Sequence, residues 1–413
     1  MKTNTILVGI TITLLLTLPA VASEDYKLGI FGNANEDETI NMQDVTYTEL
    51  IILEYRDRTE LADAKYDGKI NMQDVTQIEL VILGKEKELT IVDHGEDAVT
   101  VNKPVKRVIP DHITSLVAMR VLDAEDVIVG TQALTYYMGP TFLQDLAELP
   151  SVGGYRTPDY EAILSLNPDV YFVYRAGRAE KETIEEKLPG VTVIVTGHHE
   201  PYYSKNLNMD MRKLGYILDR RDRAEEYIDW YNGYRDMIEE RTAGLSDDEK
   251  PGVYVTCFSL YNCRRDFPPC DIAGGINIGA SIGSGYCVEV DPEWVVEQNP
   301  DVIIDPGCGR DYGYDVDDPS ALIAMREELM NHPELANVAA VKEGRVYELD
   351  IYSIGLFPNN IISIAHYAKW LHPDIFEDMD PHAIHQEYLD RFSPLNFNVE
   401  DHGVFVYPEP DES

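Results

Sequence analysis

The sequence is poor in cysteine, tryptophan and basic residues. Its 413 residues include five Cys and three Trp, and 34 basic residues stand against 74 acidic ones, for a formal charge of -40. A chain this acidic repels nucleic acid and anionic membrane surfaces, so a nucleic-acid-binding function is excluded. Beyond residue 22, no apolar run is long enough to span a bilayer. The length allows two or three domains.

The first 22 residues have the three parts of a secretion signal. A basic start, Met1-Lys2, precedes an apolar run from Ile6, and Ala20-Val-Ala22 supplies a small-x-small cleavage site. We therefore expect an exported protein, extracellular or held at the cell surface or in the periplasm. An uncleaved signal that acts as a membrane anchor is the alternative.

All five cysteines lie between residues 257 and 308. No C-x-x-C pair occurs among Cys257, Cys263, Cys270, Cys287 and Cys308, so disulfides are favoured over a zinc site in an exported chain. Since five is odd, at least one thiol is free, intermolecular or a metal ligand. Cys263 and Cys270 bracket a short segment that a disulfide between them would close into a loop.

A fourteen-residue segment occurs twice near the N-terminus. Residues 40–53 and 70–83 are identical at eleven of fourteen positions. Each copy follows a stretch in which oxygen-bearing residues alternate with the spacing of an EF-hand calcium loop. The candidate ligands, with Thr39 and Lys69 acting through the backbone, are Asn33, Asn35, Asp37, Thr39, Asn41 and Asp44 in loop one and Asp63, Asp67, Lys69, Asn71 and Asp74 in loop two.

This duplicated pattern, with aspartate at the twelfth position of each loop, resembles a dockerin module over residues 27 to 88. The resemblance implies a small all-α module that binds Ca²⁺ and docks through its two helices onto a cohesin-type partner. Glu38 stands where the turn normally has glycine, and Lys65 replaces a ligand of loop two. We therefore expect loop one to bind calcium more reliably than loop two. The alternative is that both loops are solvated acidic turns.

A second repeat organises the rest of the chain. Residues 159–173 and 291–305 each combine a short amphipathic helix, the sequence Asn-Pro-Asp, and a continuously apolar run. Proline after asparagine ends the helix, and the apolar runs suit parallel strands covered on both faces. Two such units predict two α/β lobes whose strands point their carboxyl ends at a shared cleft. Between the units, residues 223–240 have the apolar spacing of one long helix.

The order of lobe, long helix and lobe, together with the ending Val338-Ala-Ala-Val-Lys-Glu-Gly-Arg-Val-Tyr347, resembles the periplasmic-binding proteins of ferric-siderophore, haem and cobalamin ABC importers over residues 92 to 375. The resemblance implies a two-lobed α/β solute-binding fold, without enzymatic activity, that captures a metal chelate and delivers it to a membrane permease. The expected parts are the signal peptide (1–22), the calcium-loop module (25–88), the N-terminal lobe (92–205), the inter-lobe helix region (206–243), the C-terminal lobe (251–400) and an acidic tail (401–413).

Arginine and tyrosine side chains concentrate at the predicted strand ends, where they suit a chelate that carries carboxylates or catecholates. An exposed arginine in so acidic a chain is alternatively one half of a surface ion pair, and the adjacent histidines either ligate metal or form a polar rim. The candidate ligand-binding residues are His112, Tyr155, Arg156, Arg175, Arg178, His198, His199, Arg264, Arg265, Arg310, Tyr312, Tyr314 and Tyr352.

Two glutamates are candidates for a different contact. By the same resemblance, Glu180 and Glu293, one on each lobe, are expected to pair with the permease. The alternative is that each is stabilised only by the dipole of the helix that it begins.

The sequence contains no strong catalytic constellation. G-x-S-x-G, P-loop, H-E-x-x-H and dinucleotide motifs are missing, and the glycine-rich residues 274–285 are interpreted as a flexible loop facing the cleft. Two rival functions stay open. One is a cell-surface assembly protein that acts through the dockerin-like module. The other is a metal-cofactor enzyme that uses His198, His199 and an unpaired cysteine.

Overall fold

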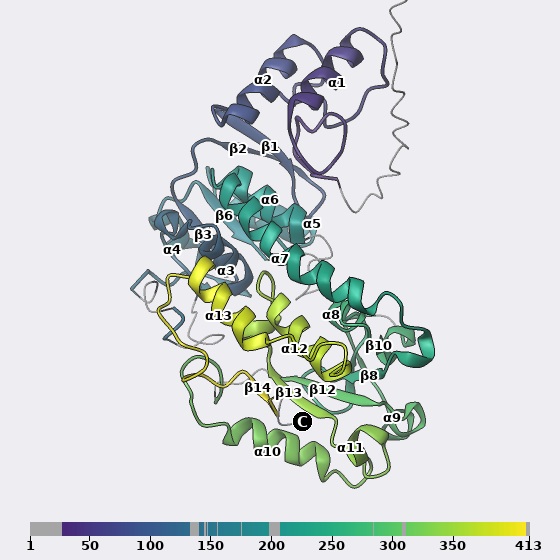
Figure 1. Ribbon diagram of the computed structural model, residues 1–413. Helices are drawn as coiled ribbons and strands as arrows, with labels where there is room; N and C mark the ends of the chain where they lie inside the picture. The colour runs from purple at the N-terminus through teal and green to yellow at the C-terminus, as the bar shows by residue number, and fades with distance from the viewer. Residues whose placement is uncertain are drawn as a thin grey trace, which may run out of the picture.

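The computed structural model describes residues 27–132, 140–143, 146, 148–154, 156–174, 176–197, 207–283, 285–307 and 311–409. Two α/β lobes lie one above the other, and a small helical part lies on the outer end of the first lobe (Figure 1). The two-lobed α/β fold predicted from the repeated Asn-Pro-Asp unit is thereby confirmed. Within the described residues, no helix combines the length and apolar character needed to cross a membrane.

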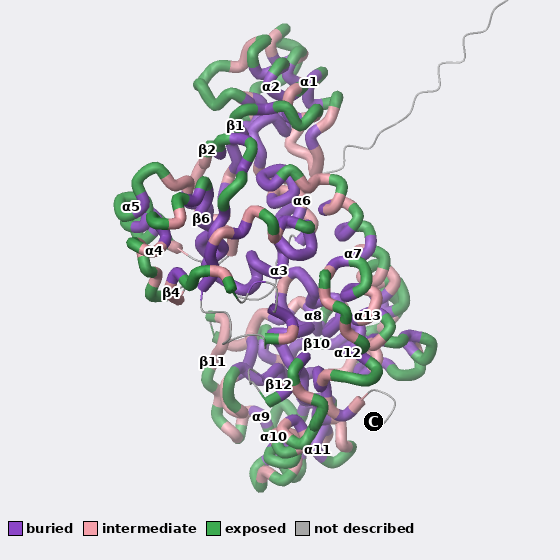
Figure 2. The backbone as a smooth tube through the Cα atoms, turned by 90° about the vertical axis from the view of Figure 1, so that its left-hand side faces the viewer, coloured by how far each residue is buried: buried purple, intermediate pink, exposed green. Residues whose placement is uncertain are grey.

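The helical part contains α1 (Met42–Ile52) and α2 (Met72–Leu83), followed by a hairpin of β1 (Glu88–Val92) and β2 (Ala98–Asn102). Both helices begin in the same way, because Asn41 and Asn71 cap the first turn and Asp44 and Asp74 complete a capping box. The buried core runs without a break from these helices through the hairpin into the first lobe (Figure 2). The helical part is therefore built onto the first lobe.

The first lobe is organised around a parallel sheet of order β3-β6-β7. Its first Asn-Pro-Asp unit has the predicted form, since Asn167 adopts φ of 45° and ends the helix just before the β6 strand. The elements of this lobe are β3 (Val108–Pro110), α3 (Ile113–Val121), η2 (Glu125–Val127), β4 (Gly153–Gly154), β5 (Thr157–Pro158), α4 (Tyr160–Ser165), β6 (Val170–Val173), α5 (Arg178–Lys187) and β7 (Thr192–Val195).

The second lobe has a five-stranded sheet of order β10-β8-β12-β13-β14, in which only β14 is antiparallel. Asn299 has φ of 46°, like its counterpart in the first lobe. The strands are β8 (Gly252–Val255), β9 (Asn262–Arg264), β10 (Ile276–Asn277), β11 (Cys287–Glu289), β12 (Val302–Gly307), β13 (Val346–Asp350) and β14 (Val406–Tyr407). The helices are η4 (Asp247–Glu249), α8 (Pro268–Ile272), η5 (Ile278–Ser281), α9 (Pro292–Gln298), α10 (Ser320–Met330), α11 (Ala339–Glu343) and η6 (Ile351–Gly355).

Two segments differ from expectation in this lobe. The glycine-rich residues 274–285 contain β10 and η5 in place of a continuous loop. Residues 401–409, expected to be part of an acidic tail, supply β14, which pairs with β13. A two-residue edge strand inside a charged segment carries too weak a pattern to be recognised in advance.

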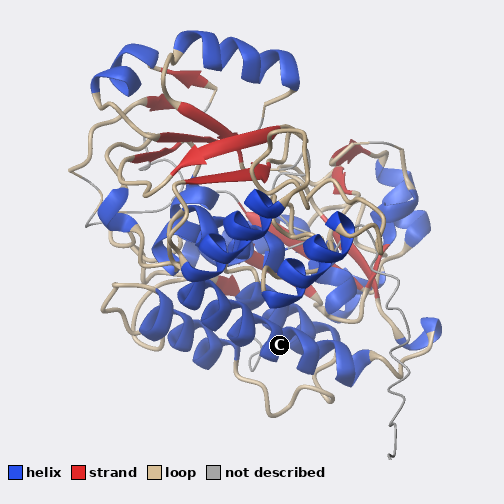
Figure 3. Ribbon diagram, turned by 90° about the horizontal axis from the view of Figure 1, so that it is seen from above, coloured by secondary structure: helices blue, strands red, loops and turns tan. Residues whose placement is uncertain are grey.

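The lobes are joined by α6 (Leu207–Ile217) and the 22-residue α7 (Arg221–Thr242), roughly 33 Å long at about 1.5 Å per residue. The long connecting helix is thus where the sequence predicts it. Along α7 lie α12 (Ile361–Leu371) and α13 (Pro381–Phe392), with Trp230 of α7 ringed by Tyr388 and Phe392 of α13. Helices lie above and below the strands in Figure 3.

Candidate functional site

The carboxyl edges of the two sheets face each other. The loop at residues 140–143 follows a strand position beside β3 in the first lobe, and residues 311–315 follow β12 in the second. These loops touch, because the Thr141 amide donates to Asp315 Oδ1 at 3.0 Å and the Phe142 ring stacks on Tyr314 with centroids 5.0 Å apart. The edges where parallel sheets bind ligands are therefore brought together.

The edge of the first lobe is built from buried, mutually bonded groups. His112 caps α3 and stacks on Tyr174, with ring centroids 3.8 Å apart. Asp111 Oδ1 accepts the Tyr174 amide at 2.7 Å, and Ser115 and Thr196 share a hydroxyl hydrogen bond of 2.9 Å. Burial raises the pKa of Asp111 well above its ordinary value. This edge is consequently a polar platform with little charge.

The edge of the second lobe contains a buried cation. Arg264, on β9, is 0% exposed, and its Nε donates to the Thr256 carbonyl at 3.0 Å. Three rings surround its guanidinium: the centroids of Tyr286, Phe267 and Phe258 lie 5.1, 5.8 and 6.0 Å from its Cζ atom. A guanidinium held between rings is fixed in place while keeping its charge.

A layer of buried carboxyl groups lies beside this cation. Asp305 and Glu348 are direct partners in the β12–β13 ladder, and the Thr256 hydroxyl donates to Asp305. Burial raises the pKa of Asp305, and burial together with the neighbouring Asp305 raises that of Glu348 well above its ordinary value. Burial also raises the pKa of Asp350 to about 6. These groups therefore favour protonation.

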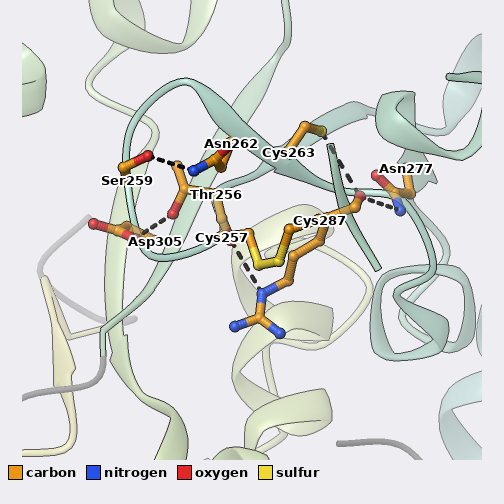
Figure 4. Close-up of a disulfide and its surroundings, with 9 residues drawn as sticks. Thr256, Cys257, Ser259, Asn262, Cys263, Asn277, Cys287 and Asp305 are labelled. Atoms are coloured by element: carbon orange, nitrogen blue, oxygen red, sulfur yellow. Dashed lines mark hydrogen bonds between the residues drawn. A yellow bond between two sulfur atoms is a disulfide. The ribbon is translucent and has the colours of Figure 1, made fainter. Parts of the chain in front are cut away.

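A disulfide fixes the same edge. Cys257 bonds to Cys287 with a Cα–Cα distance of 5.9 Å (Figure 4), whereas Cys263 and Cys270 are free thiols inside the lobe. The loop that a Cys263–Cys270 disulfide could have closed is therefore not formed in this way. The bridge between Thr256 and Cys263 and the β9–β11 ladder bring residues 257 and 287 together, and sequence spacing does not reveal such a contact. Cys308 lies outside the described residues.

Sequence reasoning missed Phe258, which directly follows Cys257 at the carboxyl end of β8. Its backbone has φ of 63°, and its side chain is 61% exposed. A bulky residue in the left-handed region is unusual, and an exposed aromatic at this edge is free to meet a ligand. The one signal in the sequence was its place immediately after a buried strand.

The other predicted ligand-binding residues fall into different environments. Tyr312, Tyr314 and Tyr352 are 7%, 4% and 6% exposed, and Tyr314 hydrogen-bonds to His385 Nε2 at 2.8 Å. Arg178 lies in an exposed position near Asp97 and Glu182, which matches the surface ion-pair alternative. Arg156 is exposed beside the β4–β5 turn, and Arg265 is half-buried. Outside the described residues lie Tyr155, Arg175, His198, His199 and Arg310.

Glu180 and Glu293 are exposed in the first turns of α5 and α9. Each is thus available to a partner, and each is also stabilised by its helix dipole. Their role in permease docking stays a prediction.

In loop one, the sixth position serves the packing of the first lobe. Glu38 pairs with Arg212 at 3.0 Å, and the same guanidinium binds Glu225 of α7. The Ile40 carbonyl accepts a weak hydrogen bond from Tyr216. These contacts give a physical reason for glutamate in place of the usual glycine. Gly68, at the same position of loop two, has φ of 84°.

The last carboxylate makes the same backbone hydrogen bonds in both loops. Asp44 accepts the Asn35 and Asn41 amides, and Asp74 accepts the Lys65 and Asn71 amides. Burial raises the pKa of both carboxyl groups; the charge of Asp37 adds to this for Asp44, whereas those of Asp63 and Asp67 add to it for Asp74. Lys65 turns toward Glu88 at 3.8 Å. Across the described part of the chain, no group of three or more His, Cys, Asp or Glu side chains is positioned to hold a metal ion.

The described fold has known relatives. Residues 114–352 match the family model described as periplasmic binding protein. FepB from Veillonella parvula, described as a TroA-like periplasmic binding protein, is 20% identical with a TM-score of 0.61, and the match covers 77% of this chain and 98% of FepB. MolA, a molybdate periplasmic binding protein from Haemophilus influenzae, is 19% identical with a TM-score of 0.61, covering 73% and 97%.

CeuE from Helicobacter pylori, in a Ni-His complex, is 17% identical with a TM-score of 0.58, and the match covers 76% of this chain and 97% of CeuE. No curated protein matches the sequence. Identities this low establish the fold and leave the ligand open. Since the family model spans more than half of the sequence, the chain belongs to the periplasmic binding protein family, the substrate-binding proteins of ABC transporters.

Proposed function

We propose that this chain is the exported binding protein of an ABC importer, and that it captures a metal chelate between its lobes and delivers it to the membrane permease. The chelate is a ferric siderophore, haem or a corrinoid. The observation that carries the proposal is the meeting of the two carboxyl edges at Phe142 and Tyr314, with the ringed guanidinium of Arg264 at one of them. Guanidinium groups and flat rings suit anionic, flat ligands.

The chemistry of the two edges favours a chelate over a compact oxyanion. A small oxyanion is usually held by several converging hydrogen-bond donors. The described second-lobe edge offers aromatic surface, with Phe258 exposed and Tyr286 half-buried. Relatives with this fold are described with a compact oxyanion and with a metal complex, since MolA is described with molybdate and CeuE with Ni-His. The aromatic surface is what supports the larger ligand here.

In this proposal, capture needs no covalent chemistry. The weakly charged platform of His112 and Tyr174 receives one side of the ligand, and the second lobe supplies the cation. The stiff helix α7 limits lobe movement to a modest closure. The loaded protein then meets the permease through Glu180 and Glu293.

The direct test is calorimetric titration of the mature protein with a ferric catecholate, a ferric hydroxamate, haem, cobinamide, cobalamin and molybdate. The proposal expects saturable binding of one chelate with a Kd below about 1 μM, a binding free energy of roughly -8 kcal/mol or stronger. Binding of molybdate alone, or of no probe by the folded protein, would contradict it.

A second role, as an assembly module, is supported by the pattern of exposure in the repeated helices. The exposed residues are identical in both copies: Met42 and Met72, Gln43 and Gln73, Thr46 and Thr76, Glu49 and Glu79, Leu53 and Leu83. The three pairs that differ are Tyr47 and Gln77, Thr48 and Ile78, and Ile51 and Val81, and all of these are buried or half-buried. Packing constraints alone would be expected to preserve the core and let the surface drift.

This exposed face also carries large apolar side chains. Met42, Met72, Leu53 and Leu83 are 59%, 56%, 61% and 64% exposed, which suits a protein partner. The dockerin-like resemblance suggests a cohesin-type protein as that partner. A pull-down with cohesin domains tests this role. A variant with Leu53→Lys and Leu83→Lys should lose the partner but keep the chelate, and retention of cohesin by that variant would reject this surface.

We further propose that the loops bind Ca²⁺. The charges of two carboxylates, Asp63 and Asp67, reach Asp74 in loop two, whereas that of Asp37 reaches Asp44 in loop one, and Lys65 is turned toward Glu88. These observations favour loop two, whereas the sequence favoured loop one. Calcium titration of the wild type and of Asp63→Asn and Asp37→Asn variants separates the loops. An unchanged Tm on adding calcium or a chelator would argue that both are solvated turns.

A further inference from the structure

Phe258 combines two features, each of which is unfavourable for the folded state. Its φ of 63° places a bulky side chain in the left-handed backbone region, and its ring is 61% exposed. The strained backbone is therefore not offset by burial of the ring. Strain of this kind persists only when the surrounding structure imposes it, and it is concentrated at binding and switching sites.

The surrounding turn imposes this conformation. Cys257 is tied to Cys287 by the disulfide, and its amide donates to the Asn262 carbonyl at 2.7 Å. The Tyr254 hydroxyl donates to the Leu260 carbonyl at 2.6 Å. The turn between β8 and β9 is thus closed by a covalent bond and by hydrogen bonds on both sides of Phe258. Its ring is held at the carboxyl end of β8 as a fixed feature.

A cation lies near the ring. The Cζ atom of Arg264 is 6.0 Å from the Phe258 centroid, and the guanidinium is fully buried. A cation near an aromatic ring draws the ring's electron density toward itself. The surface of Phe258 that remains open to solvent is then a better partner for an electron-rich ring than that of an isolated phenylalanine.

The geometry points to Phe258 as a stacking platform for a flat, anionic, electron-rich group of the ligand, such as a catecholate ring or a tetrapyrrole. This inference rests on the proposed function and narrows its ligand class. It assigns the contact with the flat face to the second lobe, and it explains why a strained aromatic is left exposed beside a disulfide. A ligand without a flat face could not stack on this ring.

The test replaces the ring while keeping the backbone. Asparagine tolerates the left-handed region, and glycine adopts it without steric cost, so Phe258→Asn and Phe258→Gly remove the ring and relieve strain. Phe258→Tyr keeps the ring. Leu164→Asn changes an exposed apolar residue of the first lobe and serves as the matched control. Kd for a ferric catecholate and for haem, and Tm without ligand, are measured for each.

We expect the Asn and Gly variants to bind the flat chelate roughly tenfold more weakly, the size of a lost stacking contact, while the Tm of Phe258→Asn rises. The Tyr and Leu164→Asn variants should bind within about twofold of wild type. Wild-type binding of a flat chelate with an unchanged Kd in the ringless variants would overturn this inference alone. Binding of molybdate alone, or of no probe, by the wild type would overturn the proposed function as well.

Discussion

The two lobes present the same parallel-sheet edge with opposite chemistry. In the first lobe, Tyr174 donates its amide to Asp111 and stacks on His112, and the raised pKa of Asp111 leaves this edge with little charge. In the second, Arg264 sits among three rings beside a disulfide and a strained Phe258. Similar folding units thus support different roles. In the proposed function, the first-lobe edge serves as a platform, and the second-lobe edge carries the groups that select the ligand.

The lobes also differ in what holds them together locally, and the largest expected effect follows from this. The Cys257–Cys287 disulfide closes a loop with a sequence separation of 30, which in the chain-entropy model is worth about 3 to 4 kcal/mol. A Cys257→Ser, Cys287→Ser variant should unfold at lower urea concentration, with hydrogen exchange accelerated in the second lobe. Equal urea midpoints for the variant and the oxidised wild type would contradict a stabilising role of the disulfide in the second lobe.

The first lobe relies instead on a buried ion pair. Lys181 Nζ lies 2.7 Å from Asp93 Oδ2, and both side chains are almost wholly buried. Lys181→Met leaves the Asp93 charge without its partner and should cost about 3 kcal/mol in urea unfolding. Arg178, on the same helix with a side chain 78% exposed, is the matched control, and Arg178→Met should cost less than about 0.5 kcal/mol. Similar losses of unfolding free energy in both variants would contradict a special contribution of the buried ion pair.

The buried carboxyl groups give a pH dependence in both lobes. Because burial raises the pKa of Asp350 from 3.8 to about 6, its contribution is fully present below pH 4 and is lost as the pH rises through 6. Asp350→Asn should therefore have nearly the stability of wild type near pH 4 and exceed it by about 3 kcal/mol at pH 7.5. Urea unfolding across this range provides the measurement.

Asp111→Asn is the first-lobe counterpart of that experiment. The pKa of Asp111 is raised well above its ordinary value, so the stability gain should begin near pH 4, as for Asp350→Asn, and should keep growing to a higher pH. If the stability of either variant relative to wild type rose as the pH fell, the sign would be wrong, and burial would be rejected as the cause of the raised pKa.

The smallest effect on folding is expected at the two exposed glutamates. A Glu180→Ala, Glu293→Ala variant should keep its ligand Kd and change stability by less than about 0.5 kcal/mol, yet lose uptake in vesicles that contain the permease. Glu182→Ala, Glu297→Ala alters exposed glutamates on the same two helices and should transport normally. Equal uptake by both double variants would refute the docking assignment.

The features of the fold that could be predicted from the sequence are those set by local sequence patterns. The Asn-Pro-Asp units predicted a helix end and a buried strand because proline restricts the residue before it, and both Asn167 and Asn299 end their helices in the left-handed region. The apolar spacing of residues 223–240 likewise predicted α7. Each of these features depends on neighbours within a few residues.

The site depended on contacts between distant residues and was only partly predictable. Arg264 was selected as a ligand-binding residue, but its burial among rings follows from the β9–β11 ladder and α8. The pairing of Cys257 with Cys287 and the backbone conformation of Phe258 follow from the same tertiary arrangement. Glu38 stands where the local turn rule has glycine, because its carboxylate pairs with Arg212, which is far along the chain.

The most direct test of the central claim is amide hydrogen exchange with and without the chelate that binds in titration. If the ligand lies between the lobes, protection should increase at both carboxyl edges, in residues 110–115 and 170–174 of the first lobe and residues 256–264 and 311–314 of the second. Protection confined to the repeated helices, or to one lobe alone, would contradict capture between two facing edges.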